Sequence, residues 1–438
     1  MNQRRLIVEN AAYMYLVQAA NYLLPLITFP YQVRILGIEN YGLLSFVASF
    51  IQYLVVFTDY GFNLTATREV SIHRKDEKRI SEICSVVYSI KTAFFLISCL
   101  FMLLLVLTIE KFNRHLVIHL VSLLAVLGNL LYPAWFYQGM ERLKTIALIN
   151  LFTRLIATVS IFLFVKGPED IVIAAVIQNG GPTLSGLVGF SGIFFIHKIH
   201  FEMPSWTMVR RYLKEGWYIF ASIVSSTLVN NTNIFLLGIF ANNIAVGYYA
   251  VAEKIVRIFI NMIVPISSSI YPHVGKLFSE SRTKALEFLK KVLLLCGLMF
   301  LFISIGIFIF ADFLVVIISG QSNPQITTLL RIMSILPFTI FVDNIYGTQI
   351  LINIGEAKRF LLSLFVPGAI SLIASLILVP RYQARATATI FLTSELLILF
   401  LMYYQTRLKG IRLWSNCQAI WIDMKNNISS LYRGLRNR

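Results

Sequence analysis

Charged side chains occur inside long apolar segments of this chain, and they are the residues that could do chemistry. An ionised group at bilayer depth is costly unless it faces water or a partner, so each such position marks a candidate site. Basic groups there could bind a phosphate, and buried carboxyls could load and release a proton. The basic residues are Lys91, Arg154, Lys254, Arg257 and Arg331, and the acidic residues within apolar segments are Asp343 and Glu395.

The depth and spacing of these residues suggest their roles. Arg154 is predicted near the centre of its segment, whereas Lys91 lies closer to an interface that its long side chain could reach. Lys254, Arg257 and Asn261 recur at i, i+3 and i+7, so they share one face of a helix and could line a cavity. The predicted substrate-binding residues are Arg154, Arg257, Lys254, Lys91, Asn261 and Arg331.

Each of these cations has an alternative role, which is an ion pair that holds neighbouring helices together. Asp59 is predicted to make such a local pair or a cap, whereas Asp343 and Glu395 are predicted to carry a coupling proton or cation. Two polar clusters also interrupt apolar segments, at residues 178–182 and 230–233. Because Gly and Pro free backbone groups that only protein or water can satisfy, the first cluster is expected beside a cavity.

Sequence motifs of catalysis are missing. His115 and His119 are spaced i, i+4, but no third metal ligand is near them in sequence. The chain has no phosphate-binding glycine loop, no Gly-x-Ser-x-Gly motif and no acidic pair in a large loop. We therefore predict no enzyme, no catalytic residue, no metal and no cofactor, so that energy comes from an ion gradient, the membrane potential or downstream consumption of the product.

Composition places these charges in a membrane. Hydrophobic residues make up 57% of the 438 residues and charged residues only 13%, which is too apolar for a water-soluble fold. The net charge of +17 would suggest nucleic acid in a soluble protein, but the basic residues lie in short loops between apolar segments. No nucleic-acid partner is predicted, and the loops are expected to contact membrane lipids.

Twelve segments of about 20 apolar residues predict an all-α integral membrane protein with 12 transmembrane helices. The first half contains Tyr13–Val33, Leu43–Tyr60, Val86–Ile109, Leu116–Phe136, Ile146–Val165 and Ile171–Ile196. The second half contains Trp217–Phe240, Val251–Tyr271, Val292–Ala311, Leu329–Ile352, Phe360–Val379 and Ala386–Tyr404. The short apolar piece Phe313–Ile318 is expected to form a re-entrant or interfacial turn.

The distribution of basic residues predicts the orientation. About 27 lie in loops on the side of the N-terminus, about 6 on the other side and about 5 inside spans, so both termini are expected in the cytoplasm. The predicted organisation is an N-terminal six-helix lobe (residues 1–200), a cytoplasmic crossover linker (201–216), a C-terminal six-helix lobe (217–406) and a basic cytoplasmic tail (407–438).

Two sequence echoes indicate an internal repeat. Leu36-Gly37 followed by Tyr41-Gly42 recurs as Leu237-Gly238 followed by Gly247-Tyr248, and residues 138–144 resemble residues 354–358. Because each half has an even number of helices, the two lobes should have the same orientation and be related by a pseudo-twofold axis along the membrane normal. Two such lobes imply a central polar cavity.

Several short motifs carry a resemblance to a known family, and the most specific of them is Pro133–Glu141 (PAWFYQGME). The other matching segments are Pro30-Tyr31, Arg34–Gly37, Tyr41-Gly42, Asp59–Gly61, Arg68–Ser71, Gly247–Lys254 and Ile270–Pro272. By these motifs the chain resembles, over essentially its whole length, bacterial O-antigen and polysaccharide repeat-unit flippases of the multidrug/oligosaccharidyl-lipid/polysaccharide exporter superfamily.

This resemblance implies two six-helix lobes that open alternately to either side of the bacterial inner membrane. The implied substrate is an undecaprenyl-pyrophosphate-linked oligosaccharide that crosses from the cytoplasmic to the periplasmic leaflet, and the implied protein partners are a polysaccharide polymerase and a chain-length regulator. One alternative is a peptidoglycan-precursor or multidrug exporter of the same superfamily. Another is an O-antigen polymerase or ligase, which is expected to have a long periplasmic loop, and a third is a structural scaffold, which leaves the buried charges unexplained.

Overall fold

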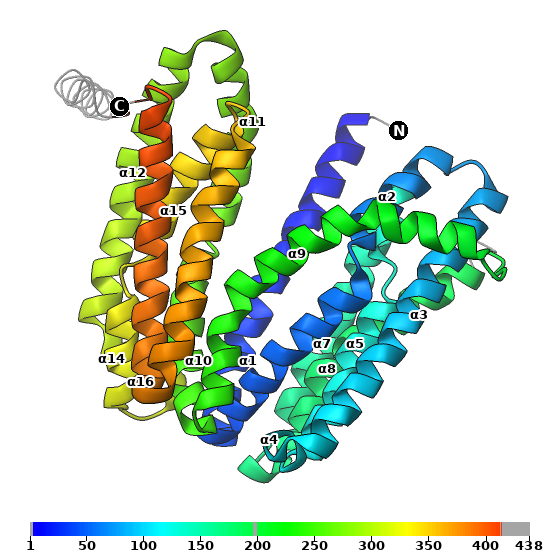
Figure 1. The fold of residues 1–438 in the computed structure, drawn as a ribbon, viewed down its shortest axis with the longest axis horizontal. Helices are drawn as coiled ribbons and strands as arrows, with labels where there is room; N and C mark the ends of the chain where they lie inside the picture. The colour runs from blue at the N-terminus through cyan, green and yellow to red at the C-terminus, as the bar shows by residue number, and fades with distance from the viewer. Residues whose placement is uncertain (1–2, 196–198, 412, 414–438) are drawn as a thin grey trace. The chain divides into compact units, whose positions relative to one another are not determined.

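The computed structural model describes residues 3–195, 199–411 and 413, and every regular element in this part of the chain is helical (Figure 1). Within these described residues, eight helices are long and apolar enough to span a membrane, or nine if a bent pair within α9 counts as one span. The prediction of an all-helical, multi-pass membrane protein is therefore confirmed, whereas the count of twelve spans stays a prediction. Most of the predicted basic tail, and the end of the span at Ile196, lie outside the described residues.

The helices follow one another along the chain as follows: α1 Gln3–Asp59, α2 Phe62–His73, α3 Glu77–Thr108, α4 Glu110–Asn113, α5 Leu116–Leu131, α6 Ala134–Gly139, α7 Leu143–Phe164, the 3-10 turn η1 Pro168–Asp170, α8 Ile171–Phe195, α9 Trp206–Phe240, α10 Asn243–Ile260, α11 Ile263–Glu280, α12 Arg282–Ile309, α13 Ala311–Ser319, α14 Pro324–Met333, α15 Leu336–Asn344, the π-helical segment η2 Ile345–Ile352 and α16 Ala357–Leu408.

The chain forms two compact units. The first unit contains Met1–Ala252, Asp312–Leu329 and Ala374–Thr387, and the second contains Glu253–Ala311, Leu330–Ile373 and Ala388–Arg438. In the first unit α5, α7 and α8 pack together, and in the second α12 packs on α15 (Figure 1). The predicted lobe boundaries at residues 200 and 217 stay a prediction.

Two very long helices each contain two predicted spans and a backbone break between them. In α1 the break is Gly37 (φ 78°, ψ 165°), and in α16 it is Gln383 (φ 48°, ψ −129°). Glycine adopts a positive φ without steric penalty because it has no Cβ. The spans predicted before and after each break are therefore separate helical segments joined without a loop.

One predicted span, Val251–Tyr271, requires a correction because it is divided between α10 and α11. The amide of Asn261 still donates to the Arg257 carbonyl at 2.9 Å, but the amide of Met262 turns to the Phe259 carbonyl at 3.2 Å. Pro265 has no N–H with which to continue the helical pattern, so the helix breaks before it. This segment is not among the eight candidate spans.

The glycines of the first sequence echo meet each other in the first unit. A Cβ built on Gly42 would lie 1.9 Å from the Asn243 carbonyl oxygen, and one on Gly247 would lie 2.2 Å from the Ile38 carbonyl oxygen. A Cβ on Gly238 would lie 2.0 Å from the Phe46 ring. Only glycine permits these contacts, so α1 packs backbone to backbone against α10.

The second echo forms the same helix end twice. The Arg142 amide donates to the Tyr137 carbonyl at 2.7 Å after Glu141 (φ 58°), and the Glu356 amide donates to the Leu351 carbonyl at 2.8 Å after Gly355 (φ 81°). A six-to-one hydrogen bond around one left-handed residue is a common way to end a helix. The predicted similarity of residues 138–144 and 354–358 thus has a structural basis.

Three basic residues on the side predicted to be periplasmic bind the carboxyl ends of helices. Arg34 donates to the carbonyls of Ile317 and Ile318 at the end of α13, and Lys111 donates to the Ala241 carbonyl after α9 at 2.6 Å. Lys166 donates to the Phe162 carbonyl near the end of α7. Cations are favourable at the negative end of the helix dipole, which explains why these residues depart from the charge bias of the loops.

Candidate functional site

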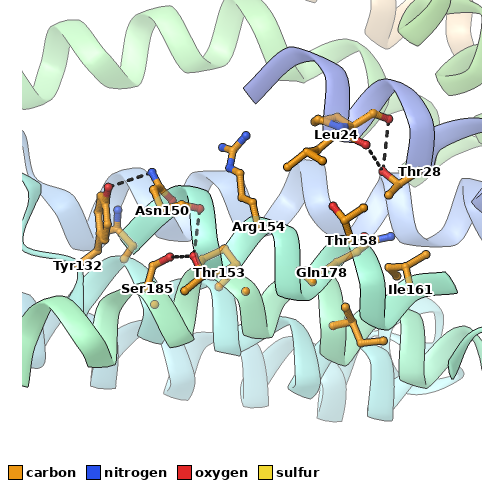
Figure 2. Close-up of a pocket in the computed structure, with 18 of the residues that line it drawn as sticks. Leu24, Thr28, Tyr132, Asn150, Thr153, Arg154, Thr158, Ile161, Gln178 and Ser185 are labelled. Carbon is orange, nitrogen blue, oxygen red and sulfur yellow. Dashed lines mark hydrogen bonds between the residues drawn. The ribbon is translucent and has the colours of Figure 1, made fainter. Parts of the chain in front are cut away.

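A polar chamber of about 520 Å³ lies within the first unit, between α1, α5, α7 and α8. Carboxamide and hydroxyl groups converge on it from all four helices or from the residue that follows α5 (Figure 2). Its polar lining consists of Thr28, Gln32, Gln52, Asn129, Tyr132, Asn150, Thr153, Arg154, Thr158, Gln178 and Ser185. The size is typical of a small-molecule site, and the amides and hydroxyls suit a polar ligand.

Arg154 is the only charged residue among those that line the chamber. Asn150, Arg154, Ala157, Thr158 and Ile161 all line it because their spacing places them on one face of α7. The Arg154 side chain is exposed, and Figure 2 shows its guanidinium extending away from α7. In the part of the chain that the structure describes, no carboxylate pairs with this guanidinium, so it is available to an anionic ligand.

Hydrogen bonds between helices fix the walls of the chamber. The Gln178 amide of α8 donates to the Gln32 side-chain oxygen of α1 at 2.8 Å, and the Asn150 amide donates to the Tyr132 hydroxyl at 3.0 Å. The hydroxyls of Thr153 and Ser185 join α7 to α8. These contacts leave the chamber preformed around Arg154.

The sequence predicted part of this wall. Gln178, Gly181 and Pro182 line the chamber, as expected for the polar interruption of that span. Sequence reasoning missed Asn150 and Tyr132. Asn150 could have been found from its place one turn before Arg154 on the same helical face.

Lys91 forms an ion pair with a neighbouring helix, which was the alternative to substrate binding. Its side chain is fully buried, and Nζ lies 3.5 Å from the Asp59 carboxylate and 2.8 Å from the Asn129 carbonyl oxygen. Asn63 also donates to the Asp59 carboxylate at 3.0 Å. Lys91 does not line the chamber, although Asn129 does. Asp59 thus forms an ion pair as predicted, but its partner lies on another helix, α3, and not nearby in sequence.

Arg257 also has a carboxylate partner, in the second unit. Its guanidinium lies 2.5 Å from the Glu253 carboxylate, one turn earlier on α10, and covers the Phe391 ring at 5.9 Å. The Glu253 side chain is 4% exposed, whereas that of Arg257 is 35% exposed. Arg257 therefore neutralises a buried carboxylate and retains a partly exposed face.

The two carboxyls predicted to couple an ion lie against each other in the second unit. The side chains of Asp343 on α15 and Glu395 on α16 interact with each other, and Arg257 acts electrostatically on Glu395. Two adjacent carboxyl groups can share one proton, because a protonated carboxyl donates to an ionised one.

The remaining predicted residues do not converge on the chamber. Lys254 and Asn261 are exposed on or directly after α10, and Arg331 covers the Phe308 ring at 5.8 Å. All three belong to the second unit, whereas the chamber belongs to the first. A cavity shared by the two groups of residues stays a prediction.

The histidine pair has a structural explanation. Nδ1 of His119 lies 2.9 Å from the His115 carbonyl oxygen within one turn of α5. Among the described residues, no group of three or more His, Cys, Asp or Glu side chains could hold a metal ion.

Comparison with known proteins gives consistent matches. The family described as "Polysaccharide biosynthesis protein" matches residues 7–278. An Escherichia coli K12 protein named "Putative O-antigen transporter" is 31% identical over 92% of this chain and 97% of its own length. A Shigella dysenteriae protein of the same name is 27% identical over 90% of this chain and 98% of its own length.

Solved structures share the fold. A lipid II flippase in an inward closed conformation aligns with a TM-score of 0.69 and 15% identity, covering 90% of this chain and 87% of its own. A multidrug transporter in an inward-facing conformation aligns with a TM-score of 0.61 and 12% identity, covering 89% of this chain and 98% of its own. At these identities the likeness concerns the fold alone.

Proposed function

Because the chain belongs to the polysaccharide biosynthesis protein family, we propose that it is a flippase for an undecaprenyl-pyrophosphate-linked O-antigen or related repeat unit. In this proposal the substrate crosses from the cytoplasmic to the periplasmic leaflet of a bacterial inner membrane, and both termini are cytoplasmic. The family, the relatives with O-antigen transporter names and the fold shared with a lipid II flippase support this function. Twelve spans in two six-helix lobes, a polymerase and a chain-length regulator as partners belong to the same proposal.

The guanidinium of Arg154, which pairs with no carboxylate among the described residues and is the one charged group that lines the chamber, is the observation that carries this proposal. A lipid-linked oligosaccharide presents a doubly phosphorylated anion next to neutral hydroxyl-rich sugars. A guanidinium binds phosphate oxygens through two parallel hydrogen bonds, and carboxamides and hydroxyls match sugar hydroxyls. We assign the anion to Arg154 and the sugars to the surrounding amides of Gln32, Gln52 and Asn150.

The alternatives fit the chamber less well. A multidrug exporter of cationic compounds needs a carboxylate, and none lies among the described residues that line this chamber. A polymerase or ligase does not agree with relatives that are named as transporters. A peptidoglycan-precursor exporter would use the same anion chemistry, so only its accumulating substrate distinguishes it.

The adjacent carboxyls of Asp343 and Glu395, sharing one proton, are the proposed coupling group. If access to the pair alternates between the two sides of the membrane, the pair can load a proton on one side and release it on the other. Arg257 lies close enough to Glu395 to be sensitive to that change of charge. Arg257 thus belongs with the coupling group rather than with the substrate.

The test is deletion of the gene followed by chemical analysis of the lipid-linked oligosaccharides. We expect single completed repeat units to accumulate on the inner leaflet, and loss of surface polysaccharide. Unpolymerised units on the periplasmic side would contradict the proposal and indicate a polymerase. Accumulation of a peptidoglycan precursor would indicate the other exporter.

Complementation of the deletion tests the site. Arg154→Ala should lower translocation by about 10- to 100-fold, the equivalent of a lost charge-assisted contact of about 1.5–3 kcal/mol, and Arg154→Lys should restore part of it. Arg114→Ala is the matched control, since Arg114 is an exposed arginine that pairs with Glu110 outside the candidate spans. Full complementation by Arg154→Ala would remove Arg154 from the site.

A further inference from the structure

A second hollow, of about 530 Å³, lies along the outer surface of the α7–α8 pair. We call it the groove and define it by Leu148, Phe152 and Ile156 of α7 and Leu184 and Val188 of α8, with Lys144 at one end. Phe152 is 60% exposed and Val188 is 45% exposed, so the groove is open to the surroundings of the first unit.

The groove and the polar chamber share a wall. On a helix, residues two apart point about 200° from each other, so Phe152 faces the groove while Arg154 faces the chamber. Thr153 lies between them and lines both hollows, and its hydroxyl bonds to Ser185, which also lines the chamber. An apolar site and a polar site are therefore separated by a single layer of helix.

We propose that the groove binds the polyprenyl chain of the lipid-linked substrate, with the first phosphate at Lys144. This inference rests on the proposed function. It identifies a docking position for the substrate before its head group reaches Arg154.

Charge and length support this occupant. Apart from Thr145 and Thr153, the groove walls are aliphatic or aromatic, and the charged lining residue is a lysine at one end, which matches a single long chain that ends in a phosphate. From Lys144 to Ile156 the helix rises about 18 Å, close to the roughly 15 Å hydrocarbon depth of one leaflet. The Lys144 end lies on the side predicted to be cytoplasmic, where the substrate is made.

Continuity with the chamber distinguishes a substrate from ordinary membrane lipid. A phospholipid gains nothing from a polar chamber on the other side of the helix layer. A lipid-linked oligosaccharide needs an apolar site for its tail and a polar site for its head within reach of each other. The shared wall at Thr153 provides that proximity.

The experiment is native mass spectrometry of the purified full-length protein with three probes: undecaprenyl phosphate, undecaprenol and phosphatidylglycerol. We expect undecaprenyl phosphate to bind about tenfold more tightly than either of the others, because only it has both the single chain and the phosphate. Equal binding of phosphatidylglycerol would show that the groove is an ordinary lipid contact and would overturn the proposal.

Matched variants localise the binding. Val188→Trp should fill the groove and weaken undecaprenyl phosphate binding about tenfold, whereas Leu187→Trp, at a neighbouring residue that is 51% exposed and lines neither hollow, should not. If Val188→Trp fails to fold, two single variants of α7 make the same comparison. Phe152→Ala, in the groove, should weaken binding, whereas Leu155→Ala, at a residue that lines neither hollow, should not. Unchanged binding in the groove variants overturns the proposal.

The lysine has its own control. Lys144→Gln should weaken binding of undecaprenyl phosphate but not of undecaprenol, and Lys75→Gln, at an exposed loop lysine, should change neither. If undecaprenyl phosphate binds in the groove but the chain fails the complementation test, the proposed function is overturned and the groove assignment stands. If the chain translocates the substrate normally but the groove variants do not change binding, only the groove assignment is overturned.

Discussion

Arg154 in the first unit and Arg257 in the second are both arginines within apolar sequence, yet their surroundings differ. Arg154 extends into a chamber of neutral amides and hydroxyls. Arg257 lies 2.5 Å from the buried Glu253 carboxylate and acts electrostatically on Glu395, which interacts with Asp343. A cation without a partner can bind a ligand, whereas a neutralised cation stabilises its own helix bundle.

This difference predicts that substituting a paired cation lowers mainly the stability of the fold, whereas substituting Arg154 lowers mainly transport. Substitution of a paired cation leaves a buried carboxylate unpaired, so the fold suffers first. Substitution of Arg154 leaves no carboxylate unpaired, so only ligand binding suffers. Four predictions test this contrast, from the largest expected effect to the smallest.

Lys91→Ala should lower the free energy of unfolding by about 3–5 kcal/mol, because Asp59 would remain as a buried, unpaired charge. Thermal unfolding in detergent measures the change. The double variant Lys91→Met/Asp59→Asn removes both charges and should recover most of the loss. Wild-type stability of Lys91→Ala together with lost translocation would make Lys91 a substrate ligand instead.

Arg257→Ala should lower the free energy of unfolding by about 2 kcal/mol, less than for Lys91 because the guanidinium is partly exposed and screened. Arg154→Ala should change it by no more than about 0.5 kcal/mol, as an unpaired exposed group does. Unfolding and translocation are measured on the same preparations. The contrast between the two units fails if Arg154→Ala is the more destabilising variant.

Glu395→Gln should preserve the hydrogen bond to Asp343, because the amide can donate in place of the shared proton, and unfolding should change by about 1 kcal/mol or less. Translocation should lose its dependence on an imposed proton gradient, measured in proteoliposomes. Glu287→Gln, at an exposed glutamate of the same unit, is the control. If translocation by Glu395→Gln still depends on the proton gradient, Asp343 and Glu395 are not the coupling group.

The smallest effect concerns Glu356, in the turn before α16. A hydrogen bond from Lys409, together with the charges of Lys409 and Arg359, holds the pKa of the Glu356 carboxyl below its ordinary value. The folded state therefore binds a proton less readily than the unfolded state, so this pair stabilises the protein at neutral pH and its contribution disappears as the pH falls through the folded pKa.

Unfolding temperatures of the wild type and Glu356→Gln should accordingly differ at about pH 7 and converge toward about pH 4. The same difference at both values would show that the Glu356 charge is not involved. Arg359→Gln should reproduce part of the effect, since Arg359 contacts the same carboxylate at 3.1 Å.

The sequence predicted the membrane class and the helical fold because apolar length is a local property. It also located Arg154 and the polar interruption at Gln178, since a charge or amide at depth needs water or a partner. It did not distinguish Arg154 from Lys91, because the partner of Lys91 lies 32 residues away on another helix. Pairing depends on how helices pack, and spacing along one helix does not report it.

Breaks in helices were equally hard to foresee. Gly37 separates two predicted spans without a polar loop, and the span predicted to begin at Val251 is interrupted after Ile260, where α10 ends in an apolar region. Both breaks depend on the backbone conformation and on which carbonyls still accept a hydrogen bond from a backbone amide. Average hydropathy contains no information on either.

The contact between Gly42 and Gly247 has a consequence for motion. Side chains between two packed helices normally adjust to small movements, because they can change rotamer while the helix axes slide by about an ångström or two. Here the backbones approach directly at Gly42 and Gly247, so no side chain can adjust, and α1 and the first turns of α10 within the first unit must move together or separate completely at this point. A contact of this kind allows two discrete states, packed or separated, so a change of conformation at this point is abrupt rather than graded.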